Sequence, residues 1–180
     1  IQRRIQRRLT VRRVDSMDEY LKHLERHPDE VQALFRDILI HVTNFFREPG
    51  SFAALTTQVF PQLLKSRQPD EPIRVWVPGC STGEEAYSLA IALMEYLGEV
   101  SANIEVQIFA TDVSDEIVQR ARAGTYPENI ALDIDSERLR RFFQEVEGGY
   151  QVSKAIRALV IFARQDLTRD PPFSKIDLVS

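Results

Sequence analysis

Apolar residues in the first 65 positions recur with the period of an α-helix. Ser16 and Glu19 have the spacing of a capping box, so they predict a helix that begins at Met17. A second stripe with spacings of three and four residues follows, and it predicts another helix. This stripe consists of Val31, Leu34, Phe35, Ile38, Leu39 and Val42. A third helix is expected after residues 49–51, so this part of the chain predicts a small helical bundle.

Beyond a polar, proline-containing hinge at 68–72, short apolar runs alternate with helical stripes. The predicted strands cover residues 73–77, 104–110, 159–163 and 176–179, and the predicted helices cover 84–97, 115–123 and 136–145. Strands that alternate with helices through short connections indicate a parallel sheet with right-handed crossovers. The pattern therefore predicts an α/β fold, with a helical domain at 1–68 and a sheet domain at 69–180.

Composition limits the class of protein. The chain has 180 residues, 43% of them hydrophobic, so it can bury a core without help from disulfides or metals. A single cysteine excludes an internal disulfide and fits a reducing compartment, which leads us to expect a cytoplasmic protein. No apolar run approaches the roughly 20 residues of a membrane span. Because the sequence begins without Met and ends abruptly, we expect it to be a fragment.

The net charge of −4 hides an asymmetry between the beginning of the chain and the rest. The first 13 residues hold no acid and six arginines, which are Arg3, Arg4, Arg7, Arg8, Arg12 and Arg13. Such a segment suits an acidic partner, whether a nucleic acid, an anionic lipid or an acidic protein surface. The alternative is a solvated helix face without a partner.

The strand expected at 73–77 leads into a glycine-containing turn, and a helix follows at once. This arrangement is typical of a nucleotide-type site at the carboxyl end of a strand, where Gly79 and Gly83 allow close approach of a ligand to the backbone. Glu84 and Glu85 would repel a phosphate at the helix N-terminus and favour a ligand that carries an ammonium or sulfonium charge. The alternative is a simple turn whose acids stabilise the helix dipole.

Two further segments carry candidate chemistry. Asp112 ends the second predicted strand, where a carboxylate can accept both hydroxyls of a ribose; the alternative is a cap of the helix expected from Asp115. Thr43 and Arg47 stand four residues apart, so a helical turn would place them on one side. Phe45 and Phe46 would then fix this segment in the core. The alternative is a helix–helix corner in which Arg47 pairs with a neighbouring acid.

Together these segments resemble the CheR family of chemotaxis receptor methyltransferases. The resemblance covers nearly the whole chain, in the order and spacing of the family. The matching strings are Thr43-Asn-Phe-Phe-Arg-Glu48, Arg74-Val-Trp-Val-Pro-Gly-Cys-Ser-Thr-Gly-Glu-Glu-Ala-Tyr-Ser-Leu-Ala90, Ala110-Thr-Asp-Val113, Ala123-Gly-Thr-Tyr126 and Arg169-Asp-Pro-Pro-Phe173.

The resemblance implies an S-adenosylmethionine-dependent protein-glutamate O-methyltransferase. Its substrates would be γ-carboxylates of chemoreceptors, which become methyl esters in chemotaxis adaptation, and its second product would be S-adenosylhomocysteine. It also implies a small N-terminal helical bundle followed by a Rossmann-like methyltransferase sheet. That sheet is expected to be incomplete, because the family continues beyond the position of Ser180.

The family pattern also implies roles for individual residues. Thr43 and Arg47 would contact the methionine end of the cofactor, with Arg47 as the catalytic residue beside the transferred methyl group. Asp112 would bind the ribose. Asp166 and Leu167 would frame the adenine, although the family residue at position 166 is often Asn. The loop expected to wrap the cofactor comprises Gly79, Ser81, Thr82, Gly83 and Glu84, and no metal site is expected.

The resemblance changes the interpretation of the basic N-terminus. Its six arginines are now expected to dock on an acidic helical segment of a chemoreceptor, and not on nucleic acid or in a membrane. Two other functions remain open at this point. One is a non-catalytic S-adenosylmethionine-binding sensor module of a hybrid signalling protein, and the other is a nicotinamide-dependent oxidoreductase, which Glu84 and Glu85 disfavour.

Overall fold

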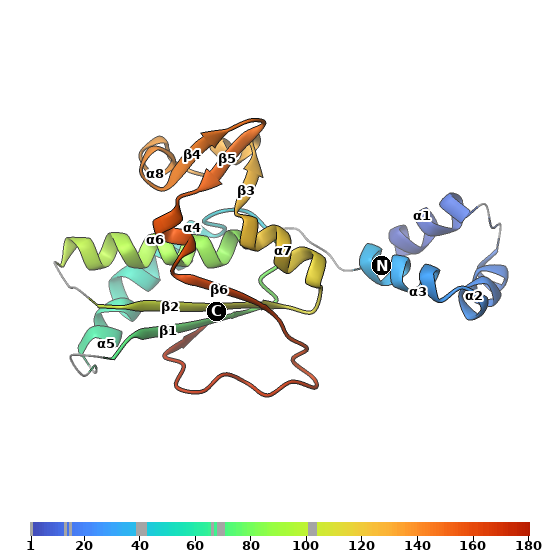
Figure 1. The fold of residues 1–180 in the computed structure, drawn as a ribbon, viewed down its shortest axis with the longest axis horizontal. Helices are drawn as coiled ribbons and strands as arrows, with labels where there is room; N and C mark the ends of the chain where they lie inside the picture. The colour runs from blue at the N-terminus through green and yellow to red at the C-terminus, as the bar shows by residue number, and fades with distance from the viewer. Residues whose placement is uncertain are drawn as a thin grey trace. The chain divides into compact units, whose positions relative to one another are not determined.

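The structure is a computed structural model that describes residues 2–12, 14, 16–38, 43–65, 67, 71–100 and 104–180 (Figure 1). Its contacts divide the chain into two compact units, Ile1–Val42 and Thr43–Ser180. Within the described ranges, no helix combines the length and the apolar composition that crossing a bilayer requires.

The first unit contains three helices: α1 (Gln2–Arg12), α2 (Met17–Arg26) and α3 (Pro28–Ile38). The predicted cap of α2 is confirmed, because the Ser16 hydroxyl oxygen accepts a hydrogen bond from the Glu19 N–H at 3.2 Å. Two members of the predicted stripe along α3, Leu39 and Val42, lie outside the described residues. The helical character predicted for this part of the chain is thus confirmed where the structure describes it.

The second unit is built on a parallel sheet with the strand order β6-β2-β1-β7. These strands are β1 (Ile73–Pro78), β2 (Val106–Asp112), β6 (Val160–Arg164) and β7 (Leu178–Val179). The helices α6 (Glu84–Glu99) and α7 (Asp115–Ala123) follow β1 and β2, and Figure 1 shows both on the same side of the sheet. Helices followed by a parallel sheet confirm the predicted fold class.

The two faces of β1 have different neighbours. Ile73, Val75 and Val77 are buried, in alternation with half-exposed residues, so one face of the strand lies in the core. On the other face, the segment between β6 and β7 supplies Phe173. Its ring packs edge-on against Trp76, with 5.6 Å between the ring centroids. An aromatic loop therefore covers this face of β1, where α6 covers the opposite one.

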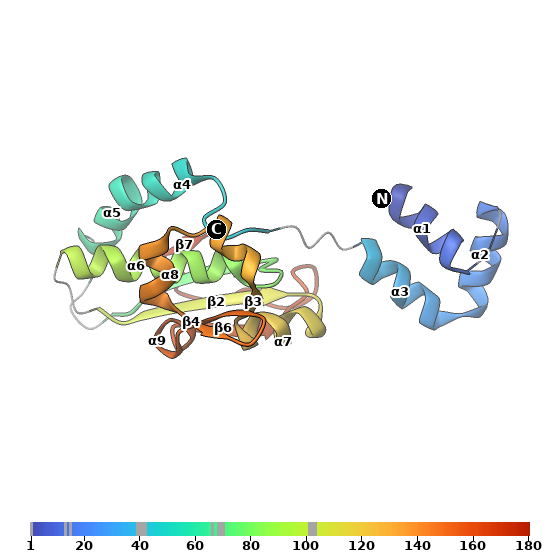
Figure 2. The ribbon, with the colours of Figure 1, turned by 90° about the horizontal axis from the view of Figure 1, so that it is seen from above.

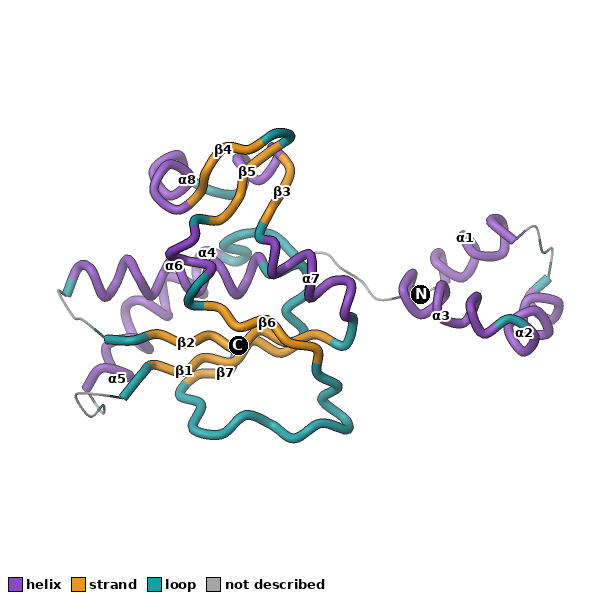
Figure 3. The backbone as a smooth tube through the Cα atoms, viewed as in Figure 1, coloured by secondary structure: helices purple, strands orange, loops and turns teal. Residues whose placement is uncertain are grey.

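A small antiparallel sheet stands apart from the main sheet (Figure 3). It consists of β3 (Thr125–Pro127), β4 (Phe143–Val146) and β5 (Gly149–Val152) in the order β3-β5-β4, with η2 (Glu128–Leu132) and α8 (Ser136–Phe142) between β3 and β4. The helix predicted over 136–145 is therefore wrong at its end. Phe143 leaves the helix because it pairs with Val152 in the sheet. The short α9 (Lys154–Arg157) then leads to β6.

The helical segment before β1 belongs to the second unit. It runs without interruption through α4 (Pro49–Ala54), the π-helical η1 (Leu55–Val59) and α5 (Phe60–Lys65), and Figure 2 shows it alongside α6. Phe60 is 1% exposed, and its ring lies 5.6 Å from the ring of Tyr96 on α6. The sequence predicted a domain boundary at 68, whereas the contacts divide the chain at Val42, because this segment completes the core beside α6.

Candidate functional site

The loop between β1 and α6 has an unusual backbone. Gly79, Ser81 and Gly83 have φ angles of 68°, 51° and 95°, so three of its five residues are left-handed. A Cβ atom on Gly83 would lie 3.1 Å from the Cβ of Ala121 and from the ring of Phe162. Only glycine therefore allows the loop to pack this closely on α7 and β6, which brings the start of α6 to the edge of the sheet.

Cys80 lies at the bottom of this loop. Its N–H donates a hydrogen bond of 2.9 Å to the carbonyl oxygen of Thr111, which ties the loop to the end of β2. Its side chain is 3% exposed, and burial raises the pKa of the thiol to about 12. The thiolate is the reactive form of cysteine, so this side chain acts as a small packing residue.

Asp112 fixes the loop from the opposite strand. Its Oδ2 accepts a hydrogen bond of 3.0 Å from the Ser81 N–H, and its Oδ1 accepts one of 3.1 Å from the Ser114 N–H. The alternative role as N-cap of α7 is wrong, because Ser114 occupies the N-cap position. A carboxylate offers about four lone-pair sites, so Asp112 retains acceptor capacity beyond these two amides.

Glu84 points inward, although it begins α6. The Thr82 hydroxyl lies 2.8 Å and 2.6 Å from its two carboxylate oxygens, and the Tyr126 hydroxyl donates to the Thr82 carbonyl oxygen at 2.7 Å. Burial raises the pKa of the Glu84 carboxyl. These contacts show that Glu84 and Thr82 stabilise the loop from within.

The segment from Thr43 to Glu48 is a tight turn. The sequence predicted a helical turn here, and this prediction is wrong, because Phe46 and Glu48 have positive φ angles of 49° and 61°. The turn nevertheless places Thr43 and Arg47 on the wall of one pocket, which is the arrangement that the helical turn was expected to produce.

Two phenylalanines fix this turn in the core, as predicted. Phe45 is 2% exposed and Phe46 is 7% exposed. The ring of Phe45 packs edge-on against Tyr126 and Phe143, at centroid distances of 4.9 Å and 5.3 Å. The turn is therefore attached to the part of the chain that carries the small antiparallel sheet.

The pocket has a volume of about 350 Å³ and brings together charges of both signs. Arg47 contributes a guanidinium, and Glu85, in the first turn of α6, contributes a carboxylate that accepts a hydrogen bond of 2.6 Å from the Ser180 hydroxyl. Glu48 adds a second carboxylate to the lining, and a pocket with charges of both signs suits a ligand that itself carries both charges. It is lined by Thr43, Asn44, Arg47, Glu48, Ser51, Phe52, Leu55, Glu85, Leu89 and Ser180.

Glu85 lines the pocket, although the sequence prediction did not select it. The prediction chose Glu84, which is 9% exposed and bound to Thr82, while Glu85 lines the pocket. Adjacent residues on a helix point in directions about 100° apart, so only one of the pair can face the same cleft. The available signal was the spacing of four residues between Glu85 and Leu89, which lies on the same wall.

Asp166 and Leu167 follow β6, next to the end of β2. The adjacent Gln165 donates its N–H to the Asp112 carbonyl oxygen at 2.9 Å. The Asp166 carboxylate accepts hydrogen bonds from the Thr168 hydroxyl at 2.7 Å and from its N–H at 2.9 Å, and these bonds lower the pKa of Asp166. Leu167 is 57% exposed. The structure thus brings both residues to the edge of the sheet where Asp112 lies.

Two of the six predicted docking arginines have partners inside the first unit. Arg8 forms a bidentate pair with Glu30, at 2.9 Å and 2.6 Å, and the Arg12 guanidinium and the Tyr20 hydroxyl also donate to this carboxylate. Glu30 is fully buried, and the hydrogen bond from Arg8 is the main cause that lowers its pKa to about 2. Arg8 and Arg12 therefore join α1 to α3.

The other four predicted docking residues are less completely described. Arg3, Arg4 and Arg7 belong to α1, and Arg13 lies outside the described residues. Their docking role stays a prediction.

Comparison with known proteins matches both units. Residues 1–39 match the all-alpha domain of the CheR methyltransferases, and residues 41–180 match the SAM binding domain of the same family. The border between these matches agrees with the division at Val42.

Several relatives align with nearly the whole chain. An uncharacterized 104.1 kDa protein in the hypE 3′ region of Rhodobacter capsulatus is 41% identical over 180 residues, which are 100% of this chain and 19% of that protein. A chemotaxis protein methyltransferase of Borreliella burgdorferi is 31% identical, over 99% of this chain and 66% of its own length. Chemotaxis protein methyltransferase 2 of Pseudomonas aeruginosa is 36% identical, over 91% of this chain and 58% of its own length.

The chain thus spans at most 66% of the length of these three relatives. The match over residues 41–180 covers the loop, Asp112 and the pocket, and the match over 1–39 covers the three helices. The chain belongs to the CheR methyltransferase family and contains its all-alpha domain and its S-adenosylmethionine-binding domain.

Proposed function

We propose that this chain binds S-adenosylmethionine and transfers its methyl group to glutamate γ-carboxylates of chemoreceptors in the cytoplasm. The observation that carries the proposal is the pocket in which Arg47 and Glu85 lie, beside the loop that Asp112 fixes. The methionine end of the cofactor has a carboxylate and an ammonium group, which are the complements of a guanidinium and a carboxylate. The charged groups of the pocket therefore fit the cofactor that the family binds.

The residues of this chain have to bind and orient the reactants. When bound, S-adenosylmethionine supplies the methyl group, which passes to a carboxylate oxygen while the sulfonium becomes a neutral thioether. A γ-carboxylate is already ionised at pH 7, so no residue has to remove a proton. Arg47 is suited to orient the incoming carboxylate, and Asp112 to accept hydrogen bonds from the ribose hydroxyls. Orientation of this kind can lower the barrier by about 7–11 kcal/mol.

Docking of the receptor is the second part of the proposal. Chemoreceptor segments that carry runs of Glu would meet helix α1, and Arg3, Arg4 and Arg7 are the residues we assign to this contact. Arg8 and Arg12 contribute indirectly, because their pairs with Glu30 hold α1 on α3. A variant in which Arg3, Arg4 and Arg7 are all changed to Gln should raise the apparent KM for the receptor and leave the cofactor affinity unchanged.

Calorimetry with S-adenosylhomocysteine tests the site directly. Asp112→Ala should raise the Kd by about tenfold or more, because the ribose loses a charged acceptor. Asp115→Ala is the matched control, because it removes an exposed carboxylate at the start of α7. Asp112→Asn, which keeps the size of the side chain, and the thermal midpoint of each variant separate lost ligand contacts from a disordered loop. Equal affinity of all variants would remove the ribose assignment.

Catalysis is tested by methyl transfer. A longer version of the protein, incubated with tritiated S-adenosylmethionine and receptor-derived helices, should produce label that base releases as methanol. Cofactor binding without transfer to any receptor would favour the alternative, a sensor module without turnover.

A further inference from the structure

The backbone around Arg47 is held in an unfavourable conformation. Phe46 and Glu48, its two neighbours, both have left-handed φ angles, which non-glycine residues rarely adopt. Such a conformation persists only where surrounding contacts determine it. The position of Arg47 on the pocket wall therefore depends on whatever holds these two neighbours.

Three contacts hold Phe46. Its N–H donates a hydrogen bond of 2.9 Å to the Ser88 hydroxyl oxygen, which ties the backbone to α6. Its ring packs edge-on against Phe52 of α4, with centroids 5.2 Å apart. The guanidinium carbon of Arg138 lies 4.2 Å from the centroid of the same ring. A guanidinium at this distance is attracted by the ring quadrupole.

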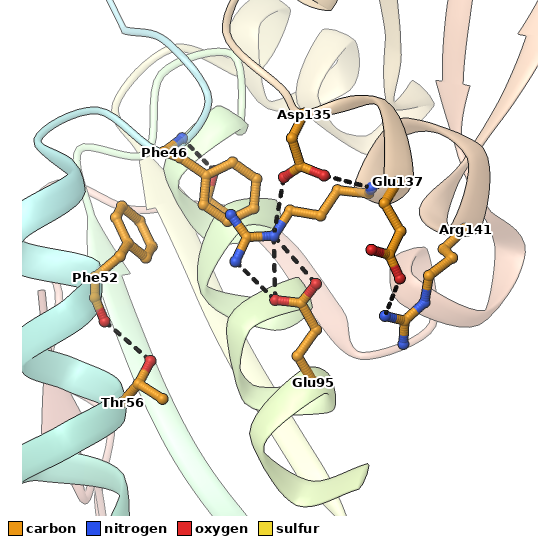
Figure 4. A network of polar contacts seen from close by, with 9 residues as sticks. Phe46, Phe52, Thr56, Glu95, Asp135, Glu137 and Arg141 are labelled. Atoms are coloured by element: carbon orange, nitrogen blue, oxygen red, sulfur yellow. Dashed lines mark hydrogen bonds and ion pairs between the residues drawn. The ribbon is translucent and has the colours of Figure 1, made fainter. Parts of the chain in front are cut away.

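Arg138 is itself fixed by acids from two elements. Its Nε lies 3.1 Å from both carboxylate oxygens of Glu95 on α6, and its Nη2 donates to Glu95 Oε2 at 2.8 Å. Asp135, the N-cap of α8, places its Oδ2 3.5 Å from Nε. Figure 4 shows Phe46, Glu95 and Asp135 converging on one guanidinium. The two acids thus fix the orientation of the Arg138 guanidinium over the Phe46 ring.

We propose that Arg138 is a positioning residue for the methyl-donor site. Directed by Glu95, its guanidinium covers the Phe46 ring and thereby holds the left-handed turn that presents Arg47 to the pocket. Arg138 acts through Phe46, because the described pocket lining includes Arg47 and not Arg138. This inference rests on the proposed function only where it assigns the pocket to the methionine end of the cofactor.

Hydrogen exchange on the ligand-free full chain tests the positioning step alone. Arg138→Gln should increase the exchange rate of the amides at 45–48. The Phe46 ring loses its contact with the guanidinium, and this contact keeps the Phe46 N–H hydrogen-bonded to the Ser88 hydroxyl. Arg141→Gln is the matched control. Arg141 lies on the same helix, pairs with Glu137 at 3.6 Å and packs over Phe142. Unchanged exchange in Arg138→Gln, or an equal increase in the control, would overturn the inference.

Calorimetry with two ligands tests the link to the site. Arg138→Gln should raise the Kd for S-adenosylhomocysteine by about three- to tenfold and leave the Kd for 5′-methylthioadenosine, which lacks the amino-acid end, unchanged. Arg138→Lys keeps the charge without the planar fork and should restore part of the affinity. Arg141→Gln should match the wild type.

Two results would overturn the inference. One is an equal loss of affinity for both ligands, and the other is a lower thermal midpoint with unchanged affinity for S-adenosylhomocysteine. A wild-type chain that binds neither ligand would count against the proposed function, and the hydrogen-exchange comparison would still decide the role of Arg138.

Discussion

Glu84 and Glu85 are adjacent carboxylates with different surroundings. Glu84 is buried against the Thr82 hydroxyl, and burial raises the pKa of its carboxyl. Glu85 lines the pocket that also contains Arg47. One residue therefore stabilises the loop, and the other lies on the wall of the pocket.

This difference predicts opposite effects of two identical substitutions. Glu85→Gln should weaken binding of S-adenosylhomocysteine by about tenfold, with little change in the free energy of unfolding, because a half-buried charge is lost from the pocket wall. Glu84→Gln is the control, and it should alter the thermal midpoint more than the ligand affinity. Titration calorimetry and thermal unfolding of both variants measure this. Weaker binding in Glu84→Gln alone would reverse the assignment.

The structure brings several of the predicted site residues close together, and the differences from the prediction have physical reasons. Asp112 was selected because a carboxylate at the end of the second predicted strand can accept ribose hydroxyls, and Thr43 and Arg47 because the family resemblance implies cofactor contacts there. The structure places Thr43 and Arg47 on the pocket wall and Asp112 at the loop. The choice between Glu84 and Glu85 depended on the direction in which α6 leaves the loop. That direction follows from the left-handed backbone at Gly83, which no local pattern reveals.

Among the elements, the three N-terminal helices show how charge can hold a small unit together. Burial of Glu30 without partners would be costly, and Arg8, Arg12 and Tyr20 compensate it. The ordinary pKa of the carboxyl is 4.5, and in the fold it is lowered to about 2. The stabilisation is therefore complete above pH 4.5 and is lost as the pH falls toward 2.

Glu30→Gln should destabilise the helical unit by about 3 kcal/mol, because it leaves two arginines without their carboxylate. The substitution should also remove most of the loss of stability between pH 4.5 and 2. Hydrogen exchange in α1, α2 and α3, followed as a function of pH, measures both effects. The exposed Glu25 on α2 provides the control Glu25→Gln. If both variants behave alike, the buried ion pairs do not hold these helices together.

The elements that the sequence predicted well are long and periodic, such as α6 and α7. The short strands β3, β4 and β5 were missed because three or four residues cannot display a period. Leu139, Phe142 and Phe143 continue a helical stripe in the sequence, and only the pairing of Phe143 with Val152 ends the helix. Tertiary contacts therefore override local preference in this region.

At the scale of the whole molecule, the division at Val42 assigns the pocket turn to the sheet unit. Phe45, Phe46 and Phe60 belong to the same core cluster as the strands of the main sheet. Polarity and proline content suggested a boundary at 68 because the hinge there is conspicuous in the sequence. The core forms through contacts between apolar residues that are far apart in the sequence, and composition does not reveal such contacts.

This division predicts how shortened chains behave. Residues 43–180 should fold alone and melt cooperatively, because they retain the complete core. Residues 69–180 should lack a cooperative transition and aggregate, since removal of each buried phenylalanine costs about 3–5 kcal/mol. Near-ultraviolet circular dichroism during heating distinguishes the two. A chain of 69–180 that melts at the same temperature as 43–180 would place the boundary at 68.

The burial of Cys80 has a practical consequence. It is the only cysteine of the chain, and burial keeps its thiol protonated at neutral pH. Maleimide dyes will therefore label cysteines introduced at the exposed positions Asp18 and Ser136 and leave the native thiol unmodified. Fluorescence transfer between two such dyes can report the distance between the helical unit and the sheet unit, with and without ligand, in a protein whose loop between β1 and α6 is unchanged.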